Sequence, residues 1–229
     1  MRLLLISSST VHGSGYLDHA APHIERVLEG RKRVGFVPFA LADHDAYTAQ
    51  LRGRLNVFGV EVSMIAAPAD VASVDAIFTG GGNTFRLLKA LYDRELIEPI
   101  RNAVANGVAY IGTSAGTNIT APTIRTTNDM PIVEPPSFSA LNLVRYQINP
   151  HYLDADPSST HMGETREERI TQFHEENDTP VVGLREASQL LVENGKTTLL
   201  GDRTARIFRR GQKAVEAEPG TTLDELLFP

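Results

Sequence analysis

The 229-residue chain contains no cysteine. This absence excludes disulfide bonds, thiolate metal sites and a cysteine nucleophile. Long hydrophobic runs are also missing. The apolar run at residues 3–6 is too short for a signal peptide, and no segment approaches the roughly 20 apolar residues that span a bilayer. We therefore expect a cytoplasmic protein that does not bind membranes.

An excess of positive charge is missing as well. The chain has 22 Lys and Arg against 28 Asp and Glu, which gives a formal net charge of −6. A broad basic face that could grip phosphates is not expected from this balance, so nucleic acid is excluded as a partner. The sequence shows no repeat, linker or low-complexity segment, and 41% of its residues are hydrophobic. We expect one catalytic domain over residues 1–229, as a monomer or a homodimer.

Apolar strands alternate with amphipathic helices over the first 120 residues, which predicts a largely parallel sheet with helices on both faces. The expected strands are 2–8, 34–40, 60–66, 75–79 and 108–113, and the expected helices are 16–28, 47–58, 84–96 and 99–105. Residues 121–136 are expected to form a loop, 144–149 a strand and 164–176 a charged helix. Five short runs then predict antiparallel strands that finish the sheet: 181–184, 189–192, 197–200, 206–209 and 214–217. The fold class is therefore α/β.

The segment Gly112-Thr113-Ser114-Ala115-Gly116 has the G-x-S-x-G pattern of a nucleophile elbow, preceded by an apolar strand. Such a turn lifts the serine hydroxyl out of the sheet, and its glycines remove side chains that would collide. The Ala115 amide would then point toward the same space as the hydroxyl. The alternative is a Gly-Ser turn that only caps a helix, because serine is a favoured N-cap residue. The strand context favours Ser114 as a nucleophile.

Three glycines, Gly80-Gly81-Gly82, end a neighbouring strand just before Asn83. A phosphate cradle is one interpretation, but the spacing lacks the G-x-G-x-x-G pattern and the P-loop lysine. The other interpretation is an oxyanion loop, in which a glycine amide acts together with the Ala115 amide. We favour the oxyanion loop.

A serine nucleophile requires a base and an acid that orients it. Of the seven histidines, His19, His23 and His174 fall in helical patterns and are expected on the surface, and His161 is a weaker candidate in a loop. His151 follows an apolar strand, where it fits a base or a structural histidine equally well. For the acid, composition leaves Glu186 and Asp129 open, and the strand-end position favours Glu186. Metal-ligand spacings such as H-E-x-x-H are absent, so we expect no metal and no cofactor.

Several longer motifs occur in order: Gly-Gly-Gly-Asn-Thr at 80–84, Gly-Thr-Ser-Ala-Gly-Thr-Asn at 112–118, Ile-Asn-Pro-His at 148–151 and Gly-Glu-Thr-Arg-Glu at 163–167. Together with residues 122–131, they resemble the peptidase E, or α-aspartyl dipeptidase, family over residues 3 to about 192. The resemblance implies a fold like the class I glutamine amidotransferases, with serine in place of their cysteine. It also implies that the protein is a serine exopeptidase acting on small aspartyl peptides.

The resemblance also implies roles for particular residues. Ser114 matches the nucleophile, His151 the base and Glu186 the acid, while Asp129 matches an aspartate that has also been given the acid role. Gly82 and Ala115 would supply the oxyanion amides. Arg166 matches the residue that binds the aspartyl carboxylate, and Asn83 is included as a second candidate for substrate binding. Two departures from the family pattern are Thr113, where an aromatic residue is common, and a longer segment at 154–162.

Three other functions are weighed against this one. A cyanophycinase-like β-aspartyl peptidase would need a pocket for arginine and room for a polymer. An α/β-hydrolase esterase would fit the chain order Ser114, Asp129, His151, but its His-Gly-Gly-Gly loop is missing. A binding module that has lost catalysis is disfavoured because the serine, the histidine and both acids are retained.

Overall fold

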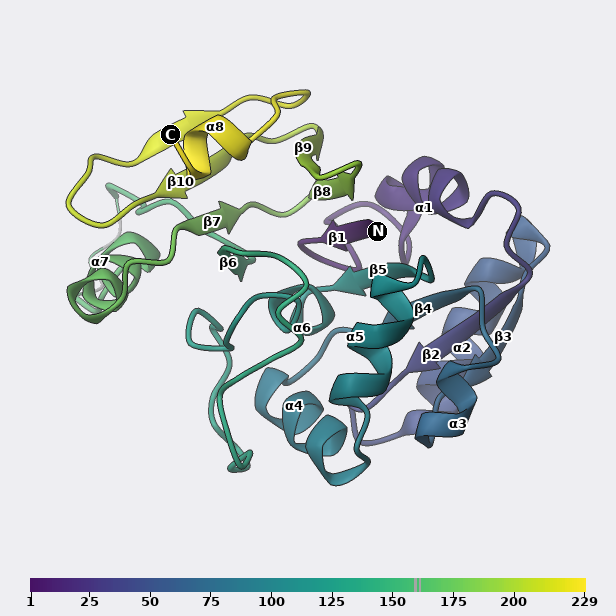
Figure 1. Cartoon of the computed structure of the whole chain (residues 1–229). Helices are drawn as coiled ribbons and strands as arrows, with labels where there is room; N and C mark the ends of the chain where they lie inside the picture. Colours follow the sequence, from purple (N-terminus) through teal and green to yellow (C-terminus); the bar gives the residue numbers. More distant parts are fainter. Residues whose placement is uncertain (159, 161) are drawn as a thin grey trace.

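The computed structural model describes residues 1–158, 160 and 162–229 (Figure 1). Its helices are α1 (Ala21–Leu28), α2 (His44–Leu55), α3 (Pro68–Val71), α4 (Thr84–Asp93), α5 (Ile97–Ala105), α6 (Ala115–Asn118), α7 (Arg166–Glu176) and α8 (Asp224–Leu227). Its strands are β1 (Arg2–Ile6), β2 (Arg33–Val37), β3 (Glu61–Met64), β4 (Ala76–Thr79), β5 (Ala109–Thr113), β6 (Gln147–Pro150), β7 (Val181–Leu184), β8 (Ser188–Glu193), β9 (Lys196–Gly201), β10 (Ala205–Phe208) and β11 (Val215–Ala217).

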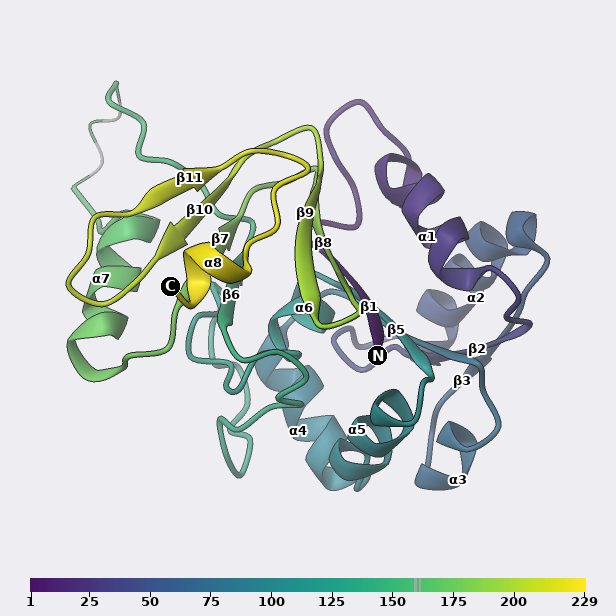
Figure 2. The ribbon, with the colours of Figure 1, turned by 45° about the horizontal axis from the view of Figure 1, so that its top comes forward.

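The main sheet has seven strands in the order β3-β2-β4-β5-β1-β8-β9. The five strands from β3 to β1 are parallel, and β8 and β9 extend the sheet in antiparallel fashion. Figure 2 shows α1 and α2 on one side of this sheet and α4 and α5 on the other. The expected α/β class, with a largely parallel sheet and antiparallel strands near the C-terminus, is confirmed.

The two faces of the sheet follow from the alternation of side chains along β1. Leu3 and Leu5 join the hydrophobic cluster that contains α4 and α5, whereas Leu4 and Ile6 join the cluster that contains α1 and α2. All four side chains are fully buried. Because both faces are covered, β1 is apolar at successive positions rather than at every second one.

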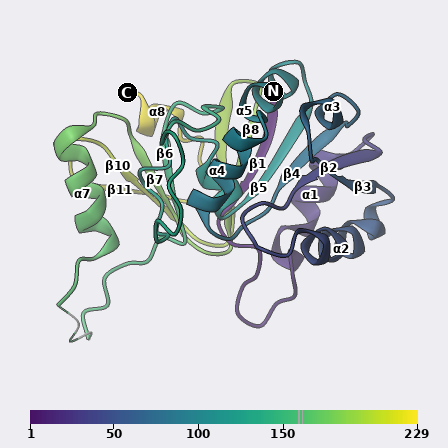
Figure 3. The same cartoon turned by 90° about the horizontal axis from the view of Figure 1, so that it is seen from below.

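The C-terminal strands depart from the sequence expectation. Only β8 and β9 finish the main sheet, while β7, β10 and β11 form a second, four-stranded sheet with β6 in the order β11-β10-β7-β6. Figure 3 shows this second sheet and α7 to one side of the main sheet. The short runs predict strands but carry no information on their pairing partners, which are distant in sequence. The hydrophobic cluster around Leu3 and Leu5 continues into the second sheet through Val182 and Leu184.

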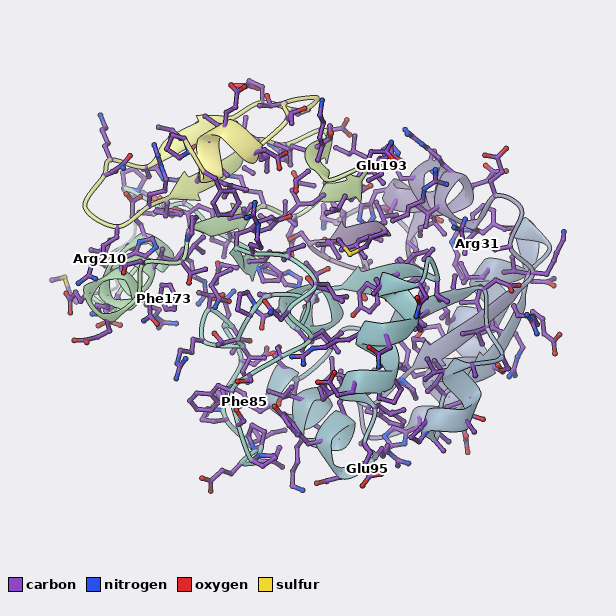
Figure 4. All side chains as sticks on the ribbon, in the orientation of Figure 1. Arg31, Phe85, Glu95, Phe173, Glu193 and Arg210 are labelled. Atoms are coloured by element: carbon purple, nitrogen blue, oxygen red, sulfur yellow. The ribbon has the colours of Figure 1, made fainter. Side chains whose placement is uncertain are left out.

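Charged side chains form salt bridges at the surface of the fold. Glu193, labelled at the end of β8 in Figure 4, forms salt bridges with Arg26 at 2.5 Å and with Arg2 at 3.5 Å.

Phe85, also labelled in Figure 4, packs edge to face on Phe138, with 6.3 Å between the ring centroids. This aromatic contact packs the loop of residues 127–139 against α4. Within the described residues, no helix is long and apolar enough to cross a membrane.

Candidate active site

The carboxyl ends of several strands meet at one place in the fold. Ser114 follows β5, and the segment Gly80-Gly81-Gly82 follows the neighbouring strand β4. His151 and Glu186 come from the second sheet, where β6 and β7 run parallel with Pro150 opposite Leu184. His151 is one residue beyond this pair and Glu186 is two residues beyond it. The register therefore brings the imidazole and the carboxylate to the same edge of the sheet.

Ser114, His151 and Glu186 form a chain of hydrogen bonds. His151 Nε2 lies 2.9 Å from Ser114 Oγ, and His151 Nδ1 lies 2.8 Å from Glu186 Oε1. A neutral imidazole that donates from Nδ1 to the carboxylate leaves Nε2 free to accept the serine proton. The histidine and glutamate side chains are 39% and 48% exposed, so solvent reaches both. This geometry suits proton transfer from a serine hydroxyl.

Unusual backbone conformations accompany these side chains. Ser114 has φ 50° and ψ −108°, and His151 has φ 52°. Ala187, directly after Glu186, has φ 68°. Residues with a Cβ rarely adopt positive φ, and each such residue costs about 1–3 kcal/mol. Strain of this kind concentrates at functional sites, where the surrounding structure enforces it.

The two glycines of the elbow leave no room for a side chain. A Cβ at Gly112 would lie 2.4 Å from the carbonyl oxygen of Gly116, and a Cβ at Gly116 would lie 2.2 Å from that of Thr79. Thr117 also stabilises the turn, because its hydroxyl donates to the carbonyl oxygens of Ile6, at 2.7 Å, and Gly112, at 2.9 Å. Both positions therefore require glycine, because the backbone at Gly112 contacts the backbone at Gly116, which in turn contacts the backbone at Thr79.

Three amides of the glycine loop are anchored to other parts of the chain. Gly80 N donates to Val37 O at 3.1 Å, and Asn83 N donates to Ala40 O at 3.0 Å. Between them, Gly81 N donates to Tyr47 Oη at 2.9 Å. The loop also lies against the nucleophile, because a Cβ at Gly81 would be 3.0 Å from Ser114 Cβ.

The Gly82 and Ala115 amides have no acceptor among the residues that the structure describes. Gly82 has φ 133°, and a Cβ there would lie 2.6 Å from Ala40 O, so only glycine fits. Both amides belong to residues that line cavities beside Ser114. They are the available backbone donors for negative charge next to the hydroxyl.

The larger of two cavities beside Ser114 has a volume of about 380 Å³. Its lining comes from the loop after β1, the α2 region and the glycine loop, and includes Ser9, Thr10, Tyr16, Leu41, Tyr47 and Gln50. This volume lies at the lower end of the range for small-ligand pockets, roughly 300–1,000 Å³. It fits a short peptide rather than a folded chain.

Asp129 lies near the nucleophile but bonds elsewhere. Its Oδ2 accepts from Thr84 N at 2.7 Å and from Thr84 Oγ1 at 2.6 Å. It forms no hydrogen bond to His151 within the described part of the chain. The structure therefore brings Glu186, and not Asp129, to the imidazole.

Neither Asn83 nor Arg166 lines the two cavities beside Ser114. Asn83 caps α4 by accepting from Arg86 N at 3.0 Å, and its amide donates to Met130 O at 2.9 Å. Arg166, the first residue of α7, lines a cavity of about 270 Å³ together with Arg169, and neither Ser114 nor His151 lines that cavity. Burial, and then the nearby Arg169, lowers the pKa of Arg166. Substrate binding by either residue stays a prediction.

Among the other histidines, His19 and His174 were both expected on the surface; both ring nitrogens of His19 are buried, and the expectation for His174 was wrong. It is buried on α7, with Nε2 3.1 Å from Thr179 O, because the helix packs this face on the second sheet. His161, named as a weaker candidate for the base, lies outside the described residues. Within the described chain, no cluster of three or more His, Asp or Glu side chains could hold a metal ion.

Sequence reasoning missed two supporting residues. Ser7 is fully buried; its Oγ accepts from His151 N at 2.9 Å and donates to Leu184 O at 2.8 Å, so it joins β1 to both strands of the second sheet that carry site residues. Tyr47 holds the glycine loop through Gly81. The run of serines after the first strand was a signal for Ser7, whereas nothing in the sequence pointed to Tyr47.

An ionic cluster lies directly beside Glu186. Arg185 bonds to both carboxylate oxygens of Asp154, at 2.6 and 2.8 Å, and to both of Glu216, at 2.8 and 3.1 Å. Asp154 lies three residues after His151, so Arg185 ties the segment after the imidazole to the loop of the carboxylate. Hydrogen bonds from Arg185 lower the pKa of Glu216 from 4.5 to about 2.

We expect Glu216→Gln to destabilise the protein at neutral pH by about 1 kcal/mol, a value reduced for the partial exposure of the carboxylate. A lowered pKa stabilises the fold fully above pH 4.5, and this contribution disappears as the pH falls toward 2. The difference between the wild type and the variant should therefore shrink over that window, as measured by urea unfolding at several pH values. Glu134→Gln, on an exposed loop, is the control. A difference that is constant down to pH 2 would contradict the role of the charge.

The chain is similar to known peptidases in sequence and in fold. The model of "Peptidase family S51" matches residues 3–200. "Peptidase E" of Streptomyces coelicolor is 56% identical over 99% of this chain and 95% of its own length, and a Drosophila melanogaster protein named "Probable alpha-aspartyl dipeptidase" is 47% identical over 98% and 97%. A crystal structure of a peptidase from an acI-B1 Actinobacterium has a TM-score of 0.72 at 17% identity, covering 96% of this chain and 95% of that one. The last likeness concerns the fold alone.

Proposed function

Because this chain belongs to peptidase family S51 and is a peptidase, we propose that it is a serine dipeptidase that removes an N-terminal aspartate from dipeptides and very short peptides. The observation that carries the proposal is the hydrogen-bonded chain from Ser114 through His151 to Glu186, at 2.9 and 2.8 Å. The relative named "Probable alpha-aspartyl dipeptidase" supports the choice of substrate.

The proposed mechanism is acyl transfer. His151 takes the Ser114 proton through Nε2, and the hydroxyl oxygen attacks the carbonyl carbon of the N-terminal aspartate. The C–O bond forms as the carbonyl π electrons move to oxygen, and this oxyanion accepts hydrogen bonds from the Gly82 and Ala115 amides. The carbonyl then re-forms from the oxyanion and the C–N bond breaks, while His151 gives its proton from Nε2 to the leaving amine. Water, deprotonated by His151, attacks the acyl-enzyme, and the Ser114–acyl C–O bond breaks as His151 returns the proton to Ser114 Oγ.

Glu186 has the orienting role in this mechanism. Its Oε1 accepts from His151 Nδ1 and so fixes the tautomer in which Nε2 can act as a base. It also stabilises the imidazolium that forms during attack. Asp129 is not used in these proton transfers, because its carboxylate holds Thr84 instead.

The test of the function is the release of p-nitroaniline from aspartyl p-nitroanilide by the purified protein. We expect turnover of this substrate and at least about 100-fold less of the leucyl analogue, because a site that pairs a substrate carboxylate rejects apolar side chains strongly. A β-linked aspartyl p-nitroanilide and p-nitrophenyl acetate serve as the matched alternatives. Preference for either would replace the proposal by a β-aspartyl peptidase or an esterase, and failure to react with any substrate or serine probe would indicate a binding protein.

A further inference from the structure

A second and much smaller cavity lies beside the nucleophile, on the side of the 127–139 loop. Its volume is about 20 Å³, which is enough for roughly one water-sized group. Ser114, Ala115 and His151 line one part of it. The rest of the lining consists of Thr84, Asn118, Thr127, Asn128, Asp129 and Pro150. No lysine or arginine is among these residues.

The carboxylate of Asp129 uses only one of its oxygens within the protein. Oδ2 accepts from Thr84 N, from Thr84 Oγ1 and, at 3.3 Å, from Thr127 Oγ1. Oδ1 accepts no hydrogen bond from any described residue. An ionised carboxylate can accept about four hydrogen bonds, so Asp129 keeps unused capacity while its position is fixed by Thr84.

Asn118 adds an independent sign that a donor belongs in this cavity. Its side chain is 1% exposed, and its Nδ2 donates to Ile148 O at 2.8 Å. This bond fixes which end of the amide is the oxygen. Asn118 Oδ1 is buried without a partner in the described chain. Buried acceptors normally find a donor, and an unpaired one is destabilising.

A site with a fixed negative charge, a second free acceptor and room for one heavy atom is suited to an ammonium group. In the proposed substrate, the α-nitrogen is separated from the reacting carbonyl carbon by a single carbon atom. We infer that this cavity binds the α-ammonium of the N-terminal residue, with Asp129 Oδ1 and Asn118 Oδ1 as acceptors. The inference rests on the proposed function, because the carbonyl must lie at Ser114.

The size and charge of the cavity would then explain why the enzyme acts at a free N-terminus. An internal residue carries an amide nitrogen with one N–H and a bulky acyl substituent. Such a group brings no positive charge to Asp129 and does not fit a space for one heavy atom. The ammonium brings three donors, and hydrogen bonds between charged groups are the strong ones. Asp129 thus contributes to binding and orientation, outside the triad.

The test compares aspartyl p-nitroanilide with succinic acid mono-p-nitroanilide, which keeps the carboxylate and has hydrogen in place of the amine. The N-acetyl derivative is the third substrate. For the wild type, we expect kcat/KM to be about 100-fold higher with the free amine than with the other two. Asp129→Asn keeps an acceptor for Thr84 and removes the charge. It should lose about 10- to 100-fold on the amine substrate and stay within about twofold on the succinyl substrate.

Glu134→Gln is the matched control, because it makes the same charge change on the same loop outside the cavity. It should leave the preference for the amine unchanged. A further readout is pH: the wild-type preference should fall above about pH 8, where the substrate ammonium loses its proton, and the variant should lack this dependence.

Each other outcome would overturn the inference. If the wild type hydrolyses the succinyl substrate as well as the aspartyl one, the cavity holds water only. If Asp129→Asn loses activity equally on both substrates, Asp129 acts only by holding Thr84, and the proposed function stands without the ammonium site. If the wild type cleaves none of the three substrates, the proposed function fails together with the inference.

Discussion

Ser114→Ala is expected to lower kcat for aspartyl p-nitroanilide by about 10⁶-fold, by analogy with the loss of the nucleophile in other serine peptidases. The hydroxyl oxygen forms the covalent bond to the substrate, and no other hydroxyl is hydrogen-bonded to His151 Nε2 in the described chain. Stability should change by less than about 1 kcal/mol, since Oγ makes only this one hydrogen bond to the residues that the structure describes and alanine keeps the Cβ. Kinetic assays and thermal unfolding together measure both expectations.

The control for this substitution is Ser73→Ala, which makes the same chemical change in an exposed turn after α3. It should retain the wild-type kcat. Residual activity of Ser114→Ala above about one per cent would show that another group attacks the carbonyl. A large loss of stability in the same variant would show instead that Ser114 acts mainly in the structure of the turn.

Gly116→Ala is expected to have the largest effect of any single methyl group at the site. The new Cβ would lie 2.2 Å from the carbonyl oxygen of Thr79 and 3.0 Å from its Cβ. Because the first contact is with the backbone of a central strand, no side-chain rotation can relieve it. We expect about 3 kcal/mol of destabilisation, or roughly 6–12 °C in Tm, together with at least a 10³-fold loss of kcat as the elbow moves.

Gly53→Ala is the matched control, because Gly53 lies within α2 and a Cβ there meets nothing within 4 Å. Alanine is the better helix former, so this variant should be more stable by about 0.5–1 kcal/mol and fully active. The same Gly→Ala substitution is thus expected to lower the free energy of unfolding at position 116 and to raise it at position 53. A Gly116→Ala protein with normal Tm and normal kcat would mean that the close packing of β4 against the elbow is wrong.

Local patterns in the sequence predict most of the main sheet, but not the second one. The strand expected at 181–184 is β7 without a change in bounds, and the elbow follows β5 as expected. The pairing of β7 with β6 and β10 depends on contacts between distant residues, which periodicity does not encode. The expectation that all the C-terminal strands would finish one sheet was wrong for this reason.

The choice between the two acids shows the same limit at the site. Composition leaves both Glu186 and Asp129 open as the acid, and the sequence favours Glu186 only through its position at the end of an expected strand, whereas Asp129 falls in an expected loop. Only the parallel register of β6 and β7 places the Glu186 carboxylate next to His151 Nδ1. Asp129 instead meets the start of α4, where Thr84 has a free amide because it begins a helix. Roles that depend on such non-local contacts require the three-dimensional structure.

The anchoring of the glycine loop has a consequence for the time course of the reaction. Val37, Ala40 and Tyr47 hold the amides on both sides of Gly82 before any substrate arrives. The loop is therefore ordered when the protein folds, so that the free-energy cost of ordering it is met at that stage. This cost does not add to the activation barrier of acylation. Acylation should begin without a lag at the first turnover, and a stiffer loop would bring no further acceleration.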